Sequence, residues 1–129
     1  KSGDKMNCTF CQKDKLDIVL ENEKAFAIYD QYPVNKGHML IIPKRHYSDF
    51  FESTSEELKD LYDLLYKAKD KLNKEYNPDG FNIGINNGQA AGQTIMHLHI
   101  HLIPRYEGDV EDPRGGIRHL KEELVPYKG

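Results

Sequence analysis

The run Met96-His97-Leu98-His99-Ile100-His101-Leu102-Ile103 places a histidine at every second position. Successive side chains of an extended strand point to opposite faces, so this spacing predicts a strand with three imidazoles on one face and apolar residues on the other. The apolar face suits a core, whereas imidazoles supply nucleophiles, proton carriers and metal ligands near neutral pH. The alternative is a solvated face without function, and with six histidines in 129 residues such a trio arises by chance in about one chain in a hundred.

The length and net charge of the chain restrict the class of protein to which it can belong. The chain has 129 residues, near the size of one ordinary domain, and 18 Lys and Arg against 21 Asp and Glu give a net charge of −3. This balance argues against a protein that binds bulk nucleic acid through a basic surface. No apolar run approaches the ~18 residues of a membrane span, and the N-terminus lacks a signal-peptide pattern. We therefore expect a cytoplasmic protein with no membrane partner.

The chain is expected to form one domain, residues 6–129, without internal repeats. Its core is expected over residues 8–106. A tail over residues 107–129 begins with a stretch too rich in glycine and charge for a core element. Residues 1–5 precede the first methionine and are treated as an N-terminal extension.

Apolar patterns predict three strands besides the histidine run and one helix, which makes the fold class α+β. Residues 25–29, 38–42 and 81–85 are the predicted strands. Ser53 or Ser55 can cap the helix, which should end before Asn77. Its apolar residues at helical spacing are Leu58, Leu61, Tyr62, Leu65, Ala68 and Leu72. We expect this helix to cover the apolar face of the strands.

The alternating histidines lie within a longer motif. A loop rich in glycine and amides, residues 86–93, leads through Thr94-Ile95-Met96 into the pattern His-φ-His-φ-His-φ-φ, where φ is apolar. This motif resembles the histidine-triad (HIT) family of nucleotide hydrolases and transferases, and Gly37-His38-Met39-Leu40-Ile41-Ile42-Pro43-Lys44 is similar to an earlier strand of that family. The resemblance implies a HIT-like fold, an antiparallel sheet with one long helix packed on it. It also implies that the sheets extend across a homodimer.

The resemblance assigns roles to the histidines. Branches of the family cleave dinucleoside polyphosphates or nucleoside phosphoramidates, transferring a nucleoside monophosphate to the protein and then to water. His99 matches the nucleophile, which forms a nucleotidyl-histidine intermediate through one ring nitrogen. Its other nitrogen must donate to a fixed acceptor, which in the family is a carbonyl near the first histidine, here His97. His101 and His38 would orient or protonate groups around the phosphate, although an ordinary histidine at a strand start is the alternative for His38.

Four further residues match nucleotide-binding positions of the family. Asp30 matches an acid that accepts hydrogen bonds from both ribose hydroxyls, and its alternative role is to initiate a turn. Asn86 matches a polar position that contacts the nucleotide, and a turn-forming asparagine is nearly as plausible in such a loop. Gln93 and Thr94 would reach the phosphate oxygens or the bridging atom.

Cys8-Thr9-Phe10-Cys11 contains the chain's two cysteines. Two thiolates at this spacing form half of a tetrahedral zinc site. His46 and His97 are the candidates for the other two ligands, an arrangement that resembles many bacterial HIT proteins. Four protein ligands would make the zinc structural. A redox Cys-x-x-Cys pair and two unligated thiols are the alternatives, and the redox pair lacks the βαβ pattern that it requires.

Together these features predict a hydrolase of purine nucleotides that acts at the α-phosphorus through His99. A nucleotidyl transferase or phosphorylase, in which another acceptor replaces water, stays open. So does a regulatory module that only binds purine nucleotides. The branch of the family that repairs nucleic-acid strand ends would require an appended basic or zinc-finger segment, and a positive net charge, that this sequence lacks.

Overall fold

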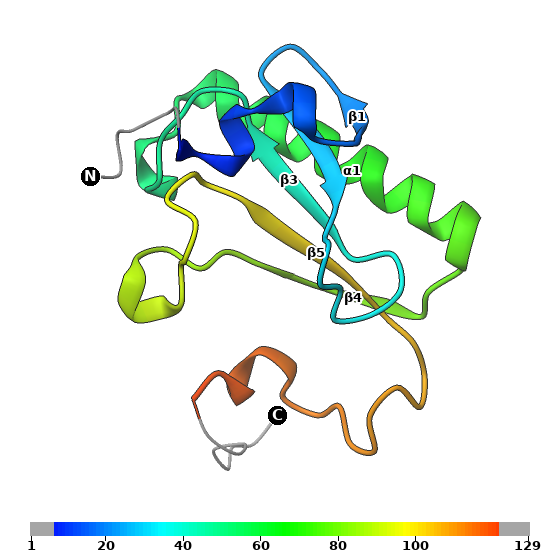
Figure 1. Cartoon of the computed structure of the whole chain (residues 1–129). Coiled ribbons are helices and arrows are strands. Elements are labelled where there is room, and N and C mark those ends of the chain that lie inside the picture. The colour runs from blue at the N-terminus through cyan, green and yellow to red at the C-terminus, as the bar shows by residue number, and fades with distance from the viewer. Residues whose placement is uncertain (1–6, 122–129) are drawn as a thin grey trace.

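The structure is a computed structural model that describes residues 7–121. It contains a sheet of five strands in the order β1-β2-β3-β5-β4, with every neighbouring pair antiparallel, and one long helix, α1 (Ser55–Tyr76), beside it (Figure 1). The strands are β1 (Ile18–Glu21), β2 (Ala25–Tyr29), β3 (Met39–Pro43), β4 (Gly80–Gly84) and β5 (Ile100–Arg105). The predicted α+β class with an antiparallel sheet is confirmed. The predicted extension 1–5, and positions 6 and 122–129 of the predicted domain, lie outside the described residues.

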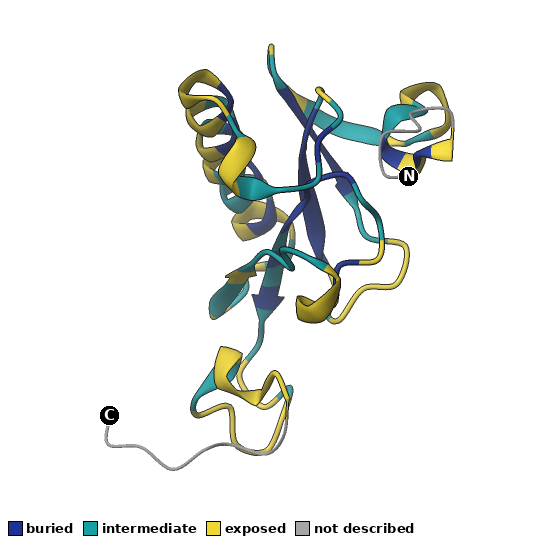
Figure 2. Cartoon of the chain, turned by 90° about the vertical axis from the view of Figure 1, so that its left-hand side faces the viewer, coloured by how far each residue is buried: buried dark blue, intermediate teal, exposed yellow. Residues whose placement is uncertain are grey.

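The strands β2 and β3 are buried on both faces because their side chains alternate between two apolar clusters. Toward α1, small and aliphatic side chains of β2, β3 and β5 meet the helix side chains Leu61, Leu64, Ala68 and Leu72. On the opposite face, Phe26, Ile28, Leu40 and Ile42 pack against Cys8 and Phe10 of the N-terminal segment. Figure 2 shows the dark, buried strands between the helix on one side and the N-terminal turns on the other.

Two expectations about the helix were wrong in detail. Its N-cap is Thr54 rather than Ser53 or Ser55, because Thr54 makes both hydrogen bonds of a capping box with Glu57. The buried stripe includes Leu64, whereas Leu58 and Tyr62 are 41% and 63% exposed. The end of the helix agrees with expectation, because Asn77 adopts the left-handed conformation that commonly terminates helices.

The capping glutamate, Glu57, makes the stability of the fold depend on pH in the acidic range. Arg45 donates to both carboxylate oxygens of Glu57, at 2.7 and 2.9 Å, and together with Thr54 it lowers the pKa of Glu57 to about 2 from an ordinary 4.5. Since the folded-state pKa is depressed, the stabilisation is fully present above pH 4.5 and is lost as the pH falls toward 2.

Glu57→Gln should therefore cost about 2 to 3 kcal/mol of unfolding free energy at pH 7 and much less at pH 2.5. Urea denaturation at both pH values measures this difference. Glu56→Gln is the matched control, because Glu56 is an exposed neighbour in the same helical turn. An equal deficit of Glu57→Gln at both pH values would contradict the assignment.

The histidine run forms a shorter strand than its pattern predicts. β5 begins at Ile100 rather than Met96, because β3 ends at Pro43 and the chain before Ile100 finds other partners. The Leu98 amide donates to the Tyr47 carbonyl at 2.7 Å, outside the sheet. Leu98, Ile100 and Leu102 nevertheless pack in the α1 cluster, as the alternation predicts. The strand missed by the sequence patterns is β1, a short segment with a break in its register.

Among residues 7–121, no helix combines the length and the hydropathy that would let it cross a membrane.

Candidate active site and metal centre

Three of the histidines gather on the face of the sheet opposite α1. His101 lies in β5 between Ile100 and Leu102, which both pack toward α1, so its ring points to the other face. Its ring centroid lies 5.2 Å from that of His99 and 5.2 Å from that of His38, which precedes β3. The β3 and β5 pairing therefore unites histidines that are 63 positions apart.

A close approach of the backbone positions His38. The preceding residue, Gly37, has a φ of +94°, and a Cβ atom there would stand 3.0 Å from side-chain atoms of Leu72 and Tyr76. Only glycine combines this conformation with so little space. The His38 side chain is consequently held in the interior, where the residue is 3% exposed.

Hydrogen bonds orient the His99 ring. Its Nδ1 donates to the His97 carbonyl at 2.9 Å, because a carbonyl oxygen can only accept. In the neutral ring the lone pair then lies on Nε2. The residue is 9% exposed, so the ring is fixed by its surroundings.

Burial keeps the neighbouring rings neutral. It lowers the pKa of His101 to about 4, with smaller contributions in the same direction from His99 and His38, while the Asp30 carboxylate opposes them. Burial also lowers the pKa of His38, again against the attraction of Asp30. At pH 7 both imidazoles therefore carry a single ring proton.

The predicted nucleotide-binding residues lie in two loops. Asp30 follows β2, with one carboxylate oxygen accepting from the Tyr32 amide at 2.8 Å and the other 3.4 Å from His38 Nε2. Thr94 is exposed and Asn86 is half-buried beside Gly92. The structure thus brings Asp30 to the histidines.

Gln93, the remaining predicted nucleotide-binding residue, makes hydrogen bonds within the protein. Its side-chain oxygen accepts from the Gly88 amide at 2.8 Å, and its side-chain nitrogen donates to the carbonyls of Ser48 and Ile95. Gln93 is 4% exposed, and its side-chain hydrogen bonds stabilise the loop that precedes the histidine run. In this arrangement Gln93 shapes the loop.

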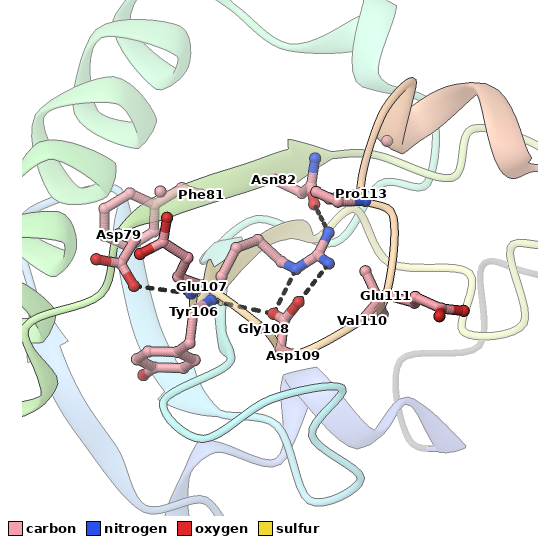
Figure 3. A pocket seen from close by; sticks show the side chains of 13 residues that line it. Asp79, Phe81, Asn82, Tyr106, Glu107, Gly108, Asp109, Val110, Glu111 and Pro113 are labelled. Atoms are coloured by element: carbon pink, nitrogen blue, oxygen red, sulfur yellow. Dashed lines mark hydrogen bonds and ion pairs between the residues drawn. The ribbon is translucent and has the colours of Figure 1, made fainter.

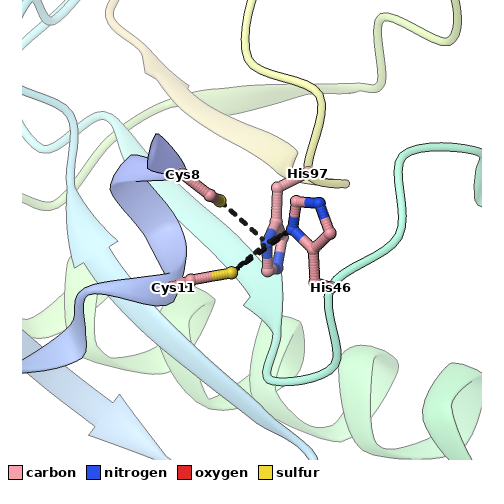
Figure 4. Close-up of side chains that lie close together, drawn as sticks. All are labelled: Cys8, Cys11, His46 and His97. Carbon is pink, nitrogen blue, oxygen red and sulfur yellow. Dashed lines mark hydrogen bonds between the residues drawn. The ribbon is translucent and has the colours of Figure 1, made fainter. Parts of the chain in front are cut away.

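A second group joins the two cysteines to two histidines (Figure 4). His97 Nδ1 lies 3.3 Å from Cys8 Sγ, 3.5 Å from Cys11 Sγ and 3.2 Å from His46 Nδ1, and Cys11 Sγ lies 3.3 Å from His46 Nδ1. Ligand atoms around a tetrahedral zinc ion stand about 3.3 to 3.8 Å apart, given bonds of ~2.3 Å to sulfur and ~2.0 Å to nitrogen. The donor set and its spacing fit zinc.

The tautomer of His97 agrees with a ligand role. Its Nε2 donates to the Pro43 carbonyl at 2.8 Å, so the Nδ1 lone pair faces the two thiols and His46. Burial lowers the pKa of His97 to about 4, against the hydrogen bond to Pro43. The first histidine of the run thus faces the cysteines rather than the other two histidines.

Phe10, which the sequence patterns did not single out, joins the two groups. Its ring lies 5.9 Å from the His97 ring and 5.2 Å from the His99 ring, and the residue is 3% exposed. Its position between the two cysteines is the sequence feature from which a place near the site could have been predicted. The turn that carries the two cysteines therefore also packs against the His99 ring.

A pocket of about 570 Å³ lies elsewhere, beside the far end of β5 (Figure 3). Arg105 in this pocket donates to both carboxylate oxygens of Asp109 and to Asn82. Its guanidinium is thus engaged within the protein, and none of the clustered histidines lines the pocket.

Comparison with known proteins places this geometry in context. The family model described as HIT domain matches residues 12–108. An uncharacterised HIT-like protein of Methanocaldococcus jannaschii is 43% identical over 95% of this chain and 99% of that protein. A bis(5'-adenosyl)-triphosphatase of Dictyostelium discoideum is 34% identical, over 85% of this chain and 74% of that protein. An AP-4-A phosphorylase of Mycobacterium tuberculosis is also 34% identical, over 71% of this chain and 48% of that protein.

Solved structures share the fold. A HIT family protein from Bacillus anthracis superposes with a TM-score of 0.73 at 42% identity, covering 78% of this chain and 74% of that one. A zinc-bound histidine triad family protein from Mycobacterium smegmatis gives a TM-score of 0.74 at 31% identity, covering 90% of this chain and 91% of that one.

Proposed function

Because this chain belongs to the HIT domain family, we propose that it is a nucleotide hydrolase that cleaves dinucleoside polyphosphates or nucleoside phosphoramidates at the α-phosphorus. The observation that carries the proposal is the hydrogen bond from His99 Nδ1 to the His97 carbonyl, which leaves a lone pair on Nε2. The centroid of this ring lies 5.2 Å from that of His101. Similarity to a triphosphatase and to a phosphorylase, both named for adenosine polyphosphates, supports this substrate class.

The reaction then proceeds in two displacements. His99 Nε2 attacks the α-phosphorus, a phosphorus–nitrogen bond forms, and the bond to the leaving group breaks with its electron pair on the leaving atom. A neighbouring donor, for which His101 is suited, supplies hydrogen bonding or a proton at the phosphate. Water next attacks the same phosphorus and gives up a proton to solvent. The phosphorus–nitrogen bond breaks with its electron pair on His99 Nε2, and the nucleoside monophosphate is released.

A panel of adenosine and guanosine polyphosphates and phosphoramidates tests this reaction. Chromatography of the products should show a nucleoside monophosphate in buffer without phosphate. Formation of a nucleoside diphosphate only when inorganic phosphate is present would instead indicate a phosphorylase, in line with the relative from Mycobacterium tuberculosis. Nucleotide binding without any product would show that the protein is a binding module.

Asp30 is proposed to select ribose. One oxygen is oriented by the Tyr32 amide, and an ionised acceptor would bind the vicinal hydroxyls of a ribonucleotide. A charge-assisted bond of roughly 1.5 to 3 kcal/mol predicts that loss of the 2′-hydroxyl lowers kcat/KM by about ten- to a hundredfold.

Matched ribo and deoxyribo substrates measure this preference. Asp30→Asn should reduce it, whereas Asp17→Asn, an exposed carboxylate, should leave it unchanged. Equal kinetics of the unaltered protein on both substrates would remove Asp30 from this role.

Zinc is proposed as a structural ion held by Cys8, Cys11, His46 and His97, in keeping with the spacing of these side chains and the zinc-bound structural relative. When bound, it would crosslink the N-terminal turn to the loop after β3, which carries His46, and to the segment before β5, which carries His97. We also propose a single domain with its core over residues 8–106, assembly as a homodimer, and a cytoplasmic location, as inferred from the sequence.

A further inference from the structure

We propose that His38 is a positioning residue that fixes the ring proton of His101 on Nε2, so that His101 presents an N–H donor in a ring whose centroid lies 5.2 Å from that of His99. The use of that donor for a phosphate rests on the proposed function. The placement of the proton does not, because it follows from hydrogen bonds within the protein.

The chain of hydrogen bonds begins at the backbone. The Val34 amide donates to His38 Nδ1 at 3.0 Å. A backbone amide has no acceptor capacity, so His38 Nδ1 must carry a lone pair and the single proton of the neutral ring must lie on Nε2. Hydrogen bonds of the His38 backbone to Asp30 and Asn35 hold this geometry.

The hydrogen bond between His38 and His101 then determines which nitrogen of His101 is protonated. His38 Nε2 lies 2.9 Å from His101 Nδ1, and since His38 Nε2 carries the proton, His101 Nδ1 accepts. Asp30 offers a second acceptor to the same proton at the longer distance of 3.4 Å. The neutral His101 ring therefore carries its own proton on Nε2.

Two backbone groups of opposite polarity thus give two adjacent histidines opposite roles. The His97 carbonyl takes the Nδ1 proton of His99 and leaves a lone pair on Nε2. The Val34 amide, acting through His38, leaves a proton on Nε2 of His101. One ring can attack while its neighbour donates.

The same hydrogen bonds argue against a metal ion at Asp30, His38 and His101, although their ligand atoms lie within 4.8 Å of one another. A cation on His38 Nε2 would move the ring proton to Nδ1. That proton would then face the Val34 amide, and two donors would oppose each other at 3.0 Å.

Nitrogen NMR of the zinc-loaded, ligand-free protein tests the placement of the proton. With ¹⁵N-labelled histidine at pH 7, the long-range spectra should show His101 and His38 with a protonated Nε2 and an unprotonated Nδ1. Signals are assigned by their loss in His101→Gln and His38→Gln. A proton on Nδ1 of His101 in the unaltered protein overturns the proposal without any activity measurement.

Two substitutions at His38 separate positioning from direct catalysis. His38→Gln supplies a side-chain N–H to His101 and should keep the Nε2-protonated form of His101 and most of the turnover. His38→Ala should let the Nδ1-protonated form of His101 appear and should lower kcat by about 10²- to 10⁴-fold with little change in KM. His119→Gln, at an exposed histidine, is the control and should change neither.

Loss of turnover in His38→Gln while His101 keeps its Nε2 proton would show that His38 itself contacts the substrate, and would overturn the positioning role. Absence of turnover in the unaltered protein, with His101 protonated as expected, would refute the proposed function and leave the proton assignment intact.

Discussion

Replacing His99 with alanine should lower kcat by about 10⁵- to 10⁶-fold, as expected for loss of an enzyme nucleophile. The loss should not come from unfolding, because His99 lies just before β5 and its side chain faces away from the α1 cluster that Leu98 and Ile100 help to form. His99→Ala should therefore keep its circular dichroism spectrum and its affinity for nucleotide. His101→Ala should be slowed by only about 10²- to 10⁴-fold, as expected for a supporting donor.

The proposed covalent intermediate gives this prediction a direct measurement. A substrate labelled in its nucleoside monophosphate portion, quenched within one turnover, should leave an acid-labile label on His99. His119→Ala is the matched control, because that histidine is exposed and distant from the sheet histidines in the chain. Wild-type turnover in His99→Ala would refute the catalytic assignment.

Removal of the zinc ligands should produce the largest loss of stability. Structural zinc in small domains contributes about 10 kcal/mol or more of apparent binding free energy, and because the site forms on folding, this energy stabilises the fold. Cys8→Ser should retain part of it and should lower the melting temperature by about 10 °C or more, which corresponds to ~3 kcal/mol for a domain of this size. Phe10 should lose its fixed contact with the His99 ring at the same time.

Metal analysis and thermal denaturation check this prediction together. Gently purified protein should contain one zinc per chain, and a chelator should lower its melting temperature at least as far as Cys8→Ser does, because it removes the whole of the zinc binding energy. Thr9→Ser is the matched control, because Thr9 is exposed in the same turn and offers no thiol. Protein without metal, or a Cys8→Ser variant of unchanged stability, would show that the cysteines are not ligands.

Local patterns predicted most of the sheet and the helix. Alternation correctly placed Leu98, Ile100 and Leu102 in the core, because the side-chain period of an extended chain holds whether or not its backbone is paired. It could not predict that β5 starts at Ile100, because that boundary depends on Pro43 and on the Tyr47 carbonyl, which lie on other segments.

The start of the helix also depends partly on local sequence and partly on tertiary contacts. Ser53 and Ser55 were the predicted caps, and the actual cap is Thr54, which lies between them and has a similar capping preference. Thr54 is selected because its amide donates to the Glu57 carboxylate, to which Arg45 of the preceding loop also donates. A tertiary contact therefore decides between caps of similar intrinsic strength.

By itself the sequence determined the chemical groups of the site and the faces on which they lie, because residue type and side-chain period are local properties. Tertiary structure decided which groups meet: Cys8 and His97 are 89 positions apart, and His38 and His101 are 63 apart. It also decided which hydrogen-bond partner each ring nitrogen meets. The proton of a neutral imidazole goes to the nitrogen that faces an acceptor, and here the folded backbone sets these partners through the His97 carbonyl and the Val34 amide.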